Sequence, residues 1–135
     1  MPELPPVLER MLALWNGEDV DARAVYAYGC VENGGDDVFD PEAIPPLVAG
    51  LRIAAPDLRF EVLDWFAAES RYVLRLRAAG THRGPFTTPI GVAAPAGHRF
   101  AMHGIEVFEV QDDLITGVWT GWNYGELYAA LGASF

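Results

Sequence analysis

The stretch from Phe100 to Trp122 constrains the fold most, because it predicts a long β-hairpin. Its two halves are rich in β-branched and aromatic residues, which favour strands. They are separated by Gln111, Asp112 and Asp113, a short polar break that is typical of a turn. We therefore expect two paired strands here, with the remaining elements packed around them.

Glu106 is conspicuous in the first strand of this hairpin because its neighbours on the same face are mostly apolar. Side chains alternate with a period of two along a strand, so this face also carries Met102, Gly104, Phe108 and Val110. A carboxylate in such surroundings either lies on the wet side of the sheet or is buried with a raised pKa. The functional hypothesis rests on the second alternative, in which other elements close a pocket over this face.

The segments before and after the sheet carry helical patterns. Apolar spacing predicts a first helix over residues 4–15, and acidic capping at residues 18–21 predicts a short second helix that ends at Tyr26 or Tyr28. A third helix starts at Pro41 and runs towards Ala55, with one turn, a kink at Pro45 and a restart at Pro46. A final short helix is expected over residues 124–131.

The remaining strands follow from alternation between apolar and polar residues. A short strand is expected over residues 29–33 before a glycine-rich turn, and longer strands over residues 58–67 and 71–79. In the first of these long strands, Leu58, Phe60, Val62 and Phe66 are placed on one face and Trp65 on the other. Residues 89–97 are expected to form a loop. Helices segregated from an antiparallel sheet define an α+β domain, and a strongly curved sheet would leave a conical cavity.

Composition narrows the function classes. The chain of 135 residues suits one domain, and its net charge of -10 argues against nucleic acid and anionic membranes. All nine cationic side chains are arginine, so a lysine Schiff base and a P-loop are excluded. A single cysteine, Cys30, indicates a reducing compartment. The chain has no apolar run of about 18 residues and no recognisable signal peptide, so we expect it to be cytoplasmic.

Several short strings, in this order and spacing, resemble the NTF2-like superfamily and, within it, the ketosteroid isomerase-like SnoaL group of polyketide cyclases and ester cyclases. The strings are residues 14–21, 41–44 with 55–60, 80–86, 105–109 with 115–119, and 127–132. The resemblance implies a single SnoaL-like domain over residues 1–135. It also implies a cystatin-like cone, in which three helices pack on a strongly curved mixed or antiparallel sheet, and a homodimer formed through the outer face of that sheet.

The resemblance also places polar residues at inward positions of the cone. Asn33 falls where ketosteroid isomerases have a general-base carboxylate, and Met11 falls near their oxyanion tyrosine. Glu106 falls where the isomerases have a protonated aspartic acid and the cyclases a histidine. Thr120 occupies the approximate place of the cyclases' acid/base aspartate. The acid pattern of limonene epoxide hydrolases is absent around residues 75–77.

These positions lead to a first hypothesis and an alternative. The first is a cofactor-independent cyclase or isomerase that binds a small apolar carbonyl compound, with Glu106 as acid or base. Asn33, Thr120 and His82 would be polar helpers, and the walls would be Met102, Phe108, Val118, Trp122 and Trp15. The alternative is a non-catalytic small-ligand-binding or dimerisation module of the same fold.

Simpler interpretations remain open for each polar candidate. Glu106 can instead pair across the sheet with Arg71, Arg75 or Arg77, and Asn33, followed by two glycines, suits a turn. The three histidines of the chain are too far apart in sequence to show metal-ligand spacing, so no metal is expected.

Overall fold

The computed structural model describes residues 3–94 and 97–131. Within them, α1 (Pro6–Trp15), a short 3₁₀ helix η1 (Ala22–Ala24) and β1 (Tyr26–Glu32) come first, followed by a second 3₁₀ helix η2 (Pro41–Ala43) and α2 (Ile44–Ala54). The rest of the chain forms β2 (Arg59–Ala68), β3 (Arg71–Thr81), β4 (Phe86–Thr88), β5 (Gly91–Ala93), β6 (Arg99–Gln111), β7 (Leu114–Trp122) and α3 (Tyr124–Leu131). No helix of the described residues is long and apolar enough to cross a membrane.

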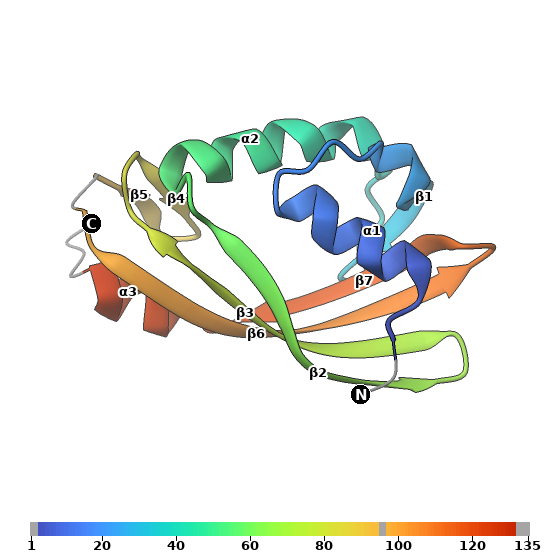
Figure 1. Ribbon diagram of the computed structural model, residues 1–135. Coiled ribbons are helices and arrows are strands. Elements are labelled where there is room, and N and C mark those ends of the chain that lie inside the picture. The colour runs from blue at the N-terminus through green and yellow to red at the C-terminus, as the bar shows by residue number, and fades with distance from the viewer. Residues whose placement is uncertain (1–2, 95–96, 132–135) are drawn as a thin grey trace.

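The sheet has the order β1-β7-β6-β3-β2, in which β1 runs parallel to β7 and the other pairs are antiparallel. The strands bend beneath α1 and α2, which lie together over one side of the sheet (Figure 1). The expected α+β class and curved mixed sheet are therefore confirmed. The central hairpin is confirmed as β6 and β7, and its turn places Asp112 and Asp113 in the left-handed region, with φ of 52° and 59°.

The expected second helix is wrong, because only the single turn η1 forms before the chain enters β1 at Tyr26. Val25, Tyr26 and Cys30 are buried in the core, and the N–H of Ile115 donates to the carbonyl of Val25 at 2.8 Å. Pairing with β7 therefore overrides the helical interpretation of this segment. Gly29 interrupts the strand with φ of +78°, and the pairing register shifts between Tyr26 and Val31.

The expected break in the third helix is confirmed, although its position differs. η2 forms one turn, in which the Asp40 carboxylate accepts the N–H of Glu42 at 3.0 Å. The α-helix then restarts at Ile44 rather than at Pro46. Both prolines consequently fall in the first turn of α2, where a missing N–H removes no helical hydrogen bond.

A β-bulge in β2 reverses the expected side-chain alternation. The register with β3 shifts between Val62 and Asp64, so that Val62 and Trp65 both pack against the core while Phe66 is 62% exposed. The prediction that Phe66 shares the inner face is therefore wrong, because one extra residue inverts every position after it. The loop expected over residues 89–97 instead contributes β5 to a small hairpin with β4, and residues 95–96 lie outside the described part.

Asn16 ties the C-terminal end of α1 to the edge strand of the sheet. Its side chain donates to the carbonyl of Phe60 at 3.0 Å and accepts the N–H of Phe60 at 2.7 Å. The side-chain amide thus satisfies both backbone groups of Phe60, as a neighbouring strand would. This pair of hydrogen bonds fixes α1 over the sheet and so sets one wall of the space between them.

Candidate functional site

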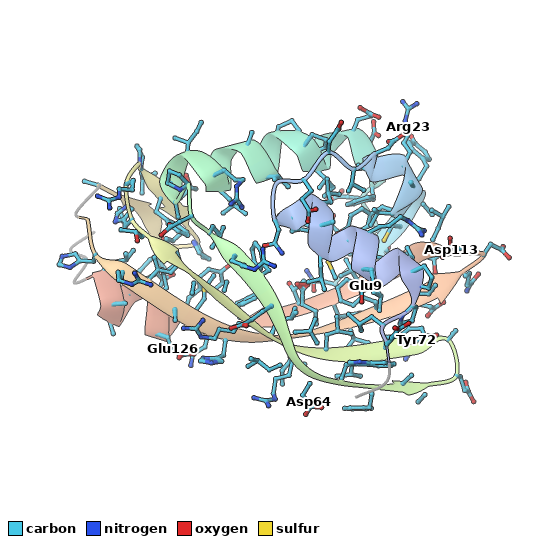
Figure 2. The ribbon with its side chains drawn as sticks, in the orientation of Figure 1. Glu9, Arg23, Asp64, Tyr72, Asp113 and Glu126 are labelled. Carbon is cyan, nitrogen blue, oxygen red and sulfur yellow. The ribbon has the colours of Figure 1, made fainter. Side chains whose placement is uncertain are left out.

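A cavity of about 290 Å³ lies between the helices and the inner face of the sheet. Figure 2 shows side chains filling the layer between α1, α2 and the strands, while Arg23, Asp64 and Glu126 point outward from it. The cavity wall is mostly apolar and draws on both helices and most strands. Its apolar members are Met11, Leu12, Trp15, Phe39, Ile44, Leu47, Leu51, Leu58, Phe60, Leu76, Phe86, Met102, Val118 and Trp122.

Glu106 is the titratable group of β6 that faces this cavity. It pairs in register with Leu74 of β3 on one side and Thr120 of β7 on the other. Part of its surface is accessible because it faces open space, yet burial among apolar neighbours raises its pKa from about 4.5 to about 7. A hydrogen bond with the Trp122 side chain opposes part of this increase in pKa.

The charge environment leaves Glu106 without a cationic partner. The described residues that line the cavity include no lysine, arginine or histidine. Arg71, Arg75 and Arg77, the alternative partners, instead pair with other acids, and their distances to Glu109, Asp64 and Glu61 are 3.4, 3.8 and 3.2 Å respectively. Because no neighbouring cation compensates the cost of burying the carboxylate, its pKa rises towards neutrality.

Trp122 reaches this position because Gly104 lies beneath it. A Cβ atom at Gly104 would lie 2.5 Å from Cδ2 of the indole ring, so only glycine allows the ring to lie against β6. The indole also packs edge-on against Phe60, with 5.8 Å between ring centroids. Gly104, Phe60 and Trp122 together set the shape of the cavity wall beside Glu106.

Asn33 and Thr120, the two helpers proposed from the sequence, are in direct contact, but they differ in their access to the cavity. Thr120 lines the cavity, whereas Asn33 lies outside its lining. Asn33 has φ of +50°, its side-chain oxygen accepts the N–H of Thr120 at 2.9 Å, and its own N–H donates to the carbonyl of Val118 at 2.8 Å. Asn33 therefore acts as a turn residue that holds the end of β1 against β7.

The residues predicted as cavity walls also differ in whether they line the cavity. Met102, Val118, Trp122 and Trp15 line the cavity, whereas Phe108 is 1% exposed and packs within the core.

His82 is fully buried, with its ring 6.0 Å from that of Phe86, and lies outside the cavity lining. Neither of its ring nitrogens has a hydrogen-bond partner among the described residues. No group of three or more potential metal ligands is found within residues 3–94 and 97–131.

Four polar residues line the cavity that the sequence analysis did not assign to it: Tyr26, Glu32, Thr87 and Tyr124. Glu32 is exposed, and Tyr124 is half-buried with its pKa raised by burial and by the negative charges of Tyr128 and Glu106. Tyr26 is 5% exposed, and its hydroxyl oxygen accepts the indole N–H of Trp15 at 2.8 Å. Alternation could not have identified Tyr26, because it would also place Tyr28 on the inner face, whereas Tyr28 is 73% exposed and the register shifts between Tyr26 and Val31.

A strongly curved sheet covered on one side by helices, with an apolar cavity between them, is the architecture of the NTF2-like fold. Residues 6–131 match the model of the SnoaL-like polyketide cyclase family, so the chain belongs to that family. A comparison with curated proteins gave no match.

Several solved structures share the fold of this chain. AclR from Streptomyces galilaeus is 27% identical, with a TM-score of 0.76 over 93% of this chain and 78% of AclR. TsrD from Streptomyces laurentii is 21% identical, with a TM-score of 0.80 over 98% of this chain and 100% of TsrD. IdmH from Streptomyces antibioticus is 22% identical, with a TM-score of 0.76 over 94% of this chain and 96% of IdmH. The latter two show the shared fold.

Proposed function

We propose that this protein is a cofactor-independent cyclase or isomerase that moves a proton on an apolar carbonyl compound bound in the cavity. The observation that carries the proposal is the position of Glu106, a carboxyl group with a pKa of about 7 that faces a largely apolar cavity, whose described lining contains no cation. Near neutral pH such a group is present in both protonation states, so it can accept a proton and return it.

The chemistry that this arrangement supports is proton abstraction next to a carbonyl. The carboxylate of Glu106 takes a proton from the α-carbon, and the electron pair of the broken C–H bond forms an enolate. In a cyclisation the enolate carbon attacks a second carbonyl group of the same molecule, and protonated Glu106 returns the proton to the new alkoxide. In an isomerisation the same proton returns to a different carbon. Neither course needs an external oxidant or reductant.

The surrounding residues supply binding and orientation. Met102, Val118, Trp122 and Trp15 offer apolar surface to the carbon skeleton of the ligand. Thr120 stands opposite Glu106 in register and offers a hydroxyl group at the same level of the cavity. Asn33 contributes indirectly, because its side chain holds the backbone of Thr120. His82 is assigned no part in the reaction because it lies outside the cavity lining.

Exchange of the α-protons of 1-tetralone in D₂O, followed by NMR, tests this proposal without knowledge of the natural substrate. We expect the wild-type protein to accelerate exchange and Glu106→Gln to lose this acceleration by a factor of about 100 or more. Glu109→Gln is the matched control, because Glu109 lies on the same strand and pairs with Arg71 instead. Exchange at the wild-type rate in Glu106→Gln would rule out the assignment of Glu106.

A non-catalytic binding module is the second candidate. It is favoured by two positions at which ketosteroid isomerases carry catalytic groups. Asn33 replaces their general-base carboxylate, and Met11 lies near the place of their oxyanion tyrosine. This candidate predicts that 1-tetralone binds, as measured by tryptophan fluorescence, while its α-protons exchange no faster than in buffer. Binding together with accelerated exchange would exclude it.

The homodimer implied by the family resemblance stays a prediction. Ile105 is 54% exposed on the face of β6 opposite Glu106, where an outer-face interface would cover it. On the neighbouring strand β3, Arg71 and Arg75 form ion pairs with Glu109 and Asp64. Light scattering coupled to size exclusion should give twice the chain mass of 14.7 kDa for a dimer, and Ile105→Glu should shift the mass towards the monomer.

A further inference from the structure

Tyr26 presents the buried hydroxyl group of the cavity. Of the four hydroxyl-bearing residues that line it, Thr87 and Thr120 are exposed and Tyr124 is half-buried, whereas Tyr26 is 5% exposed. A hydrogen bond made in a buried, apolar place is stronger than the same bond near water. Tyr26 is therefore the hydroxyl group best placed to stabilise charge in this site.

The hydroxyl proton of Tyr26 makes no hydrogen bond to any described residue. The indole N–H of Trp15 is a donor only, so the phenolic oxygen of Tyr26 is the acceptor in their contact of 2.8 Å. Among the described residues, no bond donated by the Tyr26 hydroxyl is found. The oxygen is thus held in place by one neighbour while its O–H is free to donate to a ligand.

Tyr26 also keeps its proton over a wide pH range. Burial raises the pKa of its phenol well above the ordinary value. The hydrogen bond from Trp15 lowers this pKa in part, and the negative charge of Glu106 raises it by a smaller amount. Tyr26 and Glu106 both line the same cavity. A protonated phenol in that position is a hydrogen-bond donor under all conditions in which Glu106 titrates.

We infer that the Tyr26 hydroxyl donates a hydrogen bond to the carbonyl oxygen of the bound ligand, and that Trp15 positions this hydroxyl through its indole N–H. The inference rests on the proposed function for the catalytic consequence. When Glu106 removes the α-proton, the carbonyl π electrons move onto oxygen, and the O–H of Tyr26 stabilises the developing negative charge without transferring its proton. Tyr26 thereby supplies, from β1, the hydroxyl that Met11 does not supply from α1.

The carbonyl stretching frequency of bound 1-tetralone, measured by infrared difference spectroscopy, tests the contact independently of turnover. We expect a shift to lower frequency in the wild-type protein that is lost in Tyr26→Phe. Tyr72→Phe is the matched control, because Tyr72 is a half-buried tyrosine outside the cavity lining. An unshifted wild-type band, or an equal shift in Tyr26→Phe, would overturn the inference.

The exchange rate then tests the catalytic consequence. Tyr26→Phe should lower kcat for α-proton exchange by a factor of about 100 to 1,000 and change KM only a few-fold, as for loss of one oxyanion donor. Trp15→Phe should lower kcat by a smaller factor and broaden the carbonyl band, since it leaves the hydroxyl present but unheld. Trp65→Phe, a tryptophan outside the cavity lining, should do neither.

Failure of this inference and failure of the proposed function give different results. A carbonyl shift that depends on Tyr26, without accelerated exchange in the wild-type protein, supports the donor and overturns the proposed function. Exchange that depends on Glu106 but is unchanged in Tyr26→Phe supports the proposed function and overturns the donor. Circular dichroism of each variant establishes that its fold is retained.

Discussion

Gly104 and Trp122 face each other across the β6–β7 pair, and a Cβ atom at Gly104 would lie 2.5 Å from the indole ring. No real Cβ contact is this short, so the two side-chain positions are coupled: the ring lies where it does because residue 104 has no side chain. The same indole forms a wall of the cavity and hydrogen bonds with Glu106. The absence of one methyl group on β6 therefore helps to set the environment of the reactive carboxyl.

Replacing Gly104 by alanine should displace Trp122 and damage the cavity. We expect Gly104→Ala to destabilise the fold by about 1–3 kcal/mol, as for other overpacked sites, and to weaken ligand binding. Chemical unfolding and tryptophan fluorescence measure the two effects. Gly121→Ala is the control, because the nearest atom to a Cβ there is the Ile105 carbonyl oxygen at 3.8 Å. Equal stability and binding in both variants would contradict the coupling.

The raised pKa of Glu106 predicts how stability depends on pH. Its pKa is about 7 in the folded protein and about 4.5 when unperturbed, so between these values the folded state holds more of this proton than the unfolded state. The ionisation of Glu106 therefore adds no cost well below pH 4.5, where the carboxyl group is protonated in both states. The cost grows as pH rises and reaches at most about 3 kcal/mol above pH 7.

Glu106→Gln isolates this contribution because glutamine does not titrate. The variant and the wild-type protein should be about equally stable near pH 4.5, whereas at pH 8 the variant should be the more stable of the two. Their free energies of unfolding in urea at several pH values give the difference directly. A difference that is constant across this range, or that shrinks as pH rises, would show that the carboxyl group is well solvated.

His82 is predicted to be dispensable for ligand binding and turnover. Both of its ring nitrogens are buried without a hydrogen-bond partner among the described residues, which destabilises the folded state. His82→Leu should therefore leave α-proton exchange unchanged and should be neutral or stabilising, by up to about 2 kcal/mol. Thermal unfolding and the exchange assay measure both properties. Loss of exchange in a folded His82→Leu protein would show that this side chain reaches the ligand.

The β-bulge in β2 predicts that two adjacent aromatic residues differ in their effect on stability. Trp65 packs against the core and against Tyr72, with ring centroids 6.1 Å apart, whereas Phe66 is 62% exposed. Trp65→Ala should lower the free energy of unfolding by about 2–4 kcal/mol, and Phe66→Ala by about 0.5 kcal/mol or less. The reverse order would place the bulge at another residue.

The hairpin and its acid were predictable because they depend on local pattern. Alternation across residues 100–110 placed Met102 and Glu106 on one face, and Phe108 with them, irrespective of what covered that face. The beginning of β1 was not predictable in the same way. Residues 22–28 carry no strong period of their own, and their conformation is decided by pairing with β7, a strand about ninety residues later in the chain.

The sequence by itself determined the α+β class, the central hairpin and the acid among apolar neighbours, because these follow from periodicities of two and 3.6 residues. The family followed from the resemblance of short strings in their order and spacing. Only the tertiary structure decided which polar groups share the cavity with Glu106. It brought in Tyr26, left His82 and Asn33 outside the lining, and held the Tyr26 hydroxyl with Trp15. Which residues line the same cavity depends on long-range strand register and on which elements cover the sheet, and neither is encoded within a short window of sequence.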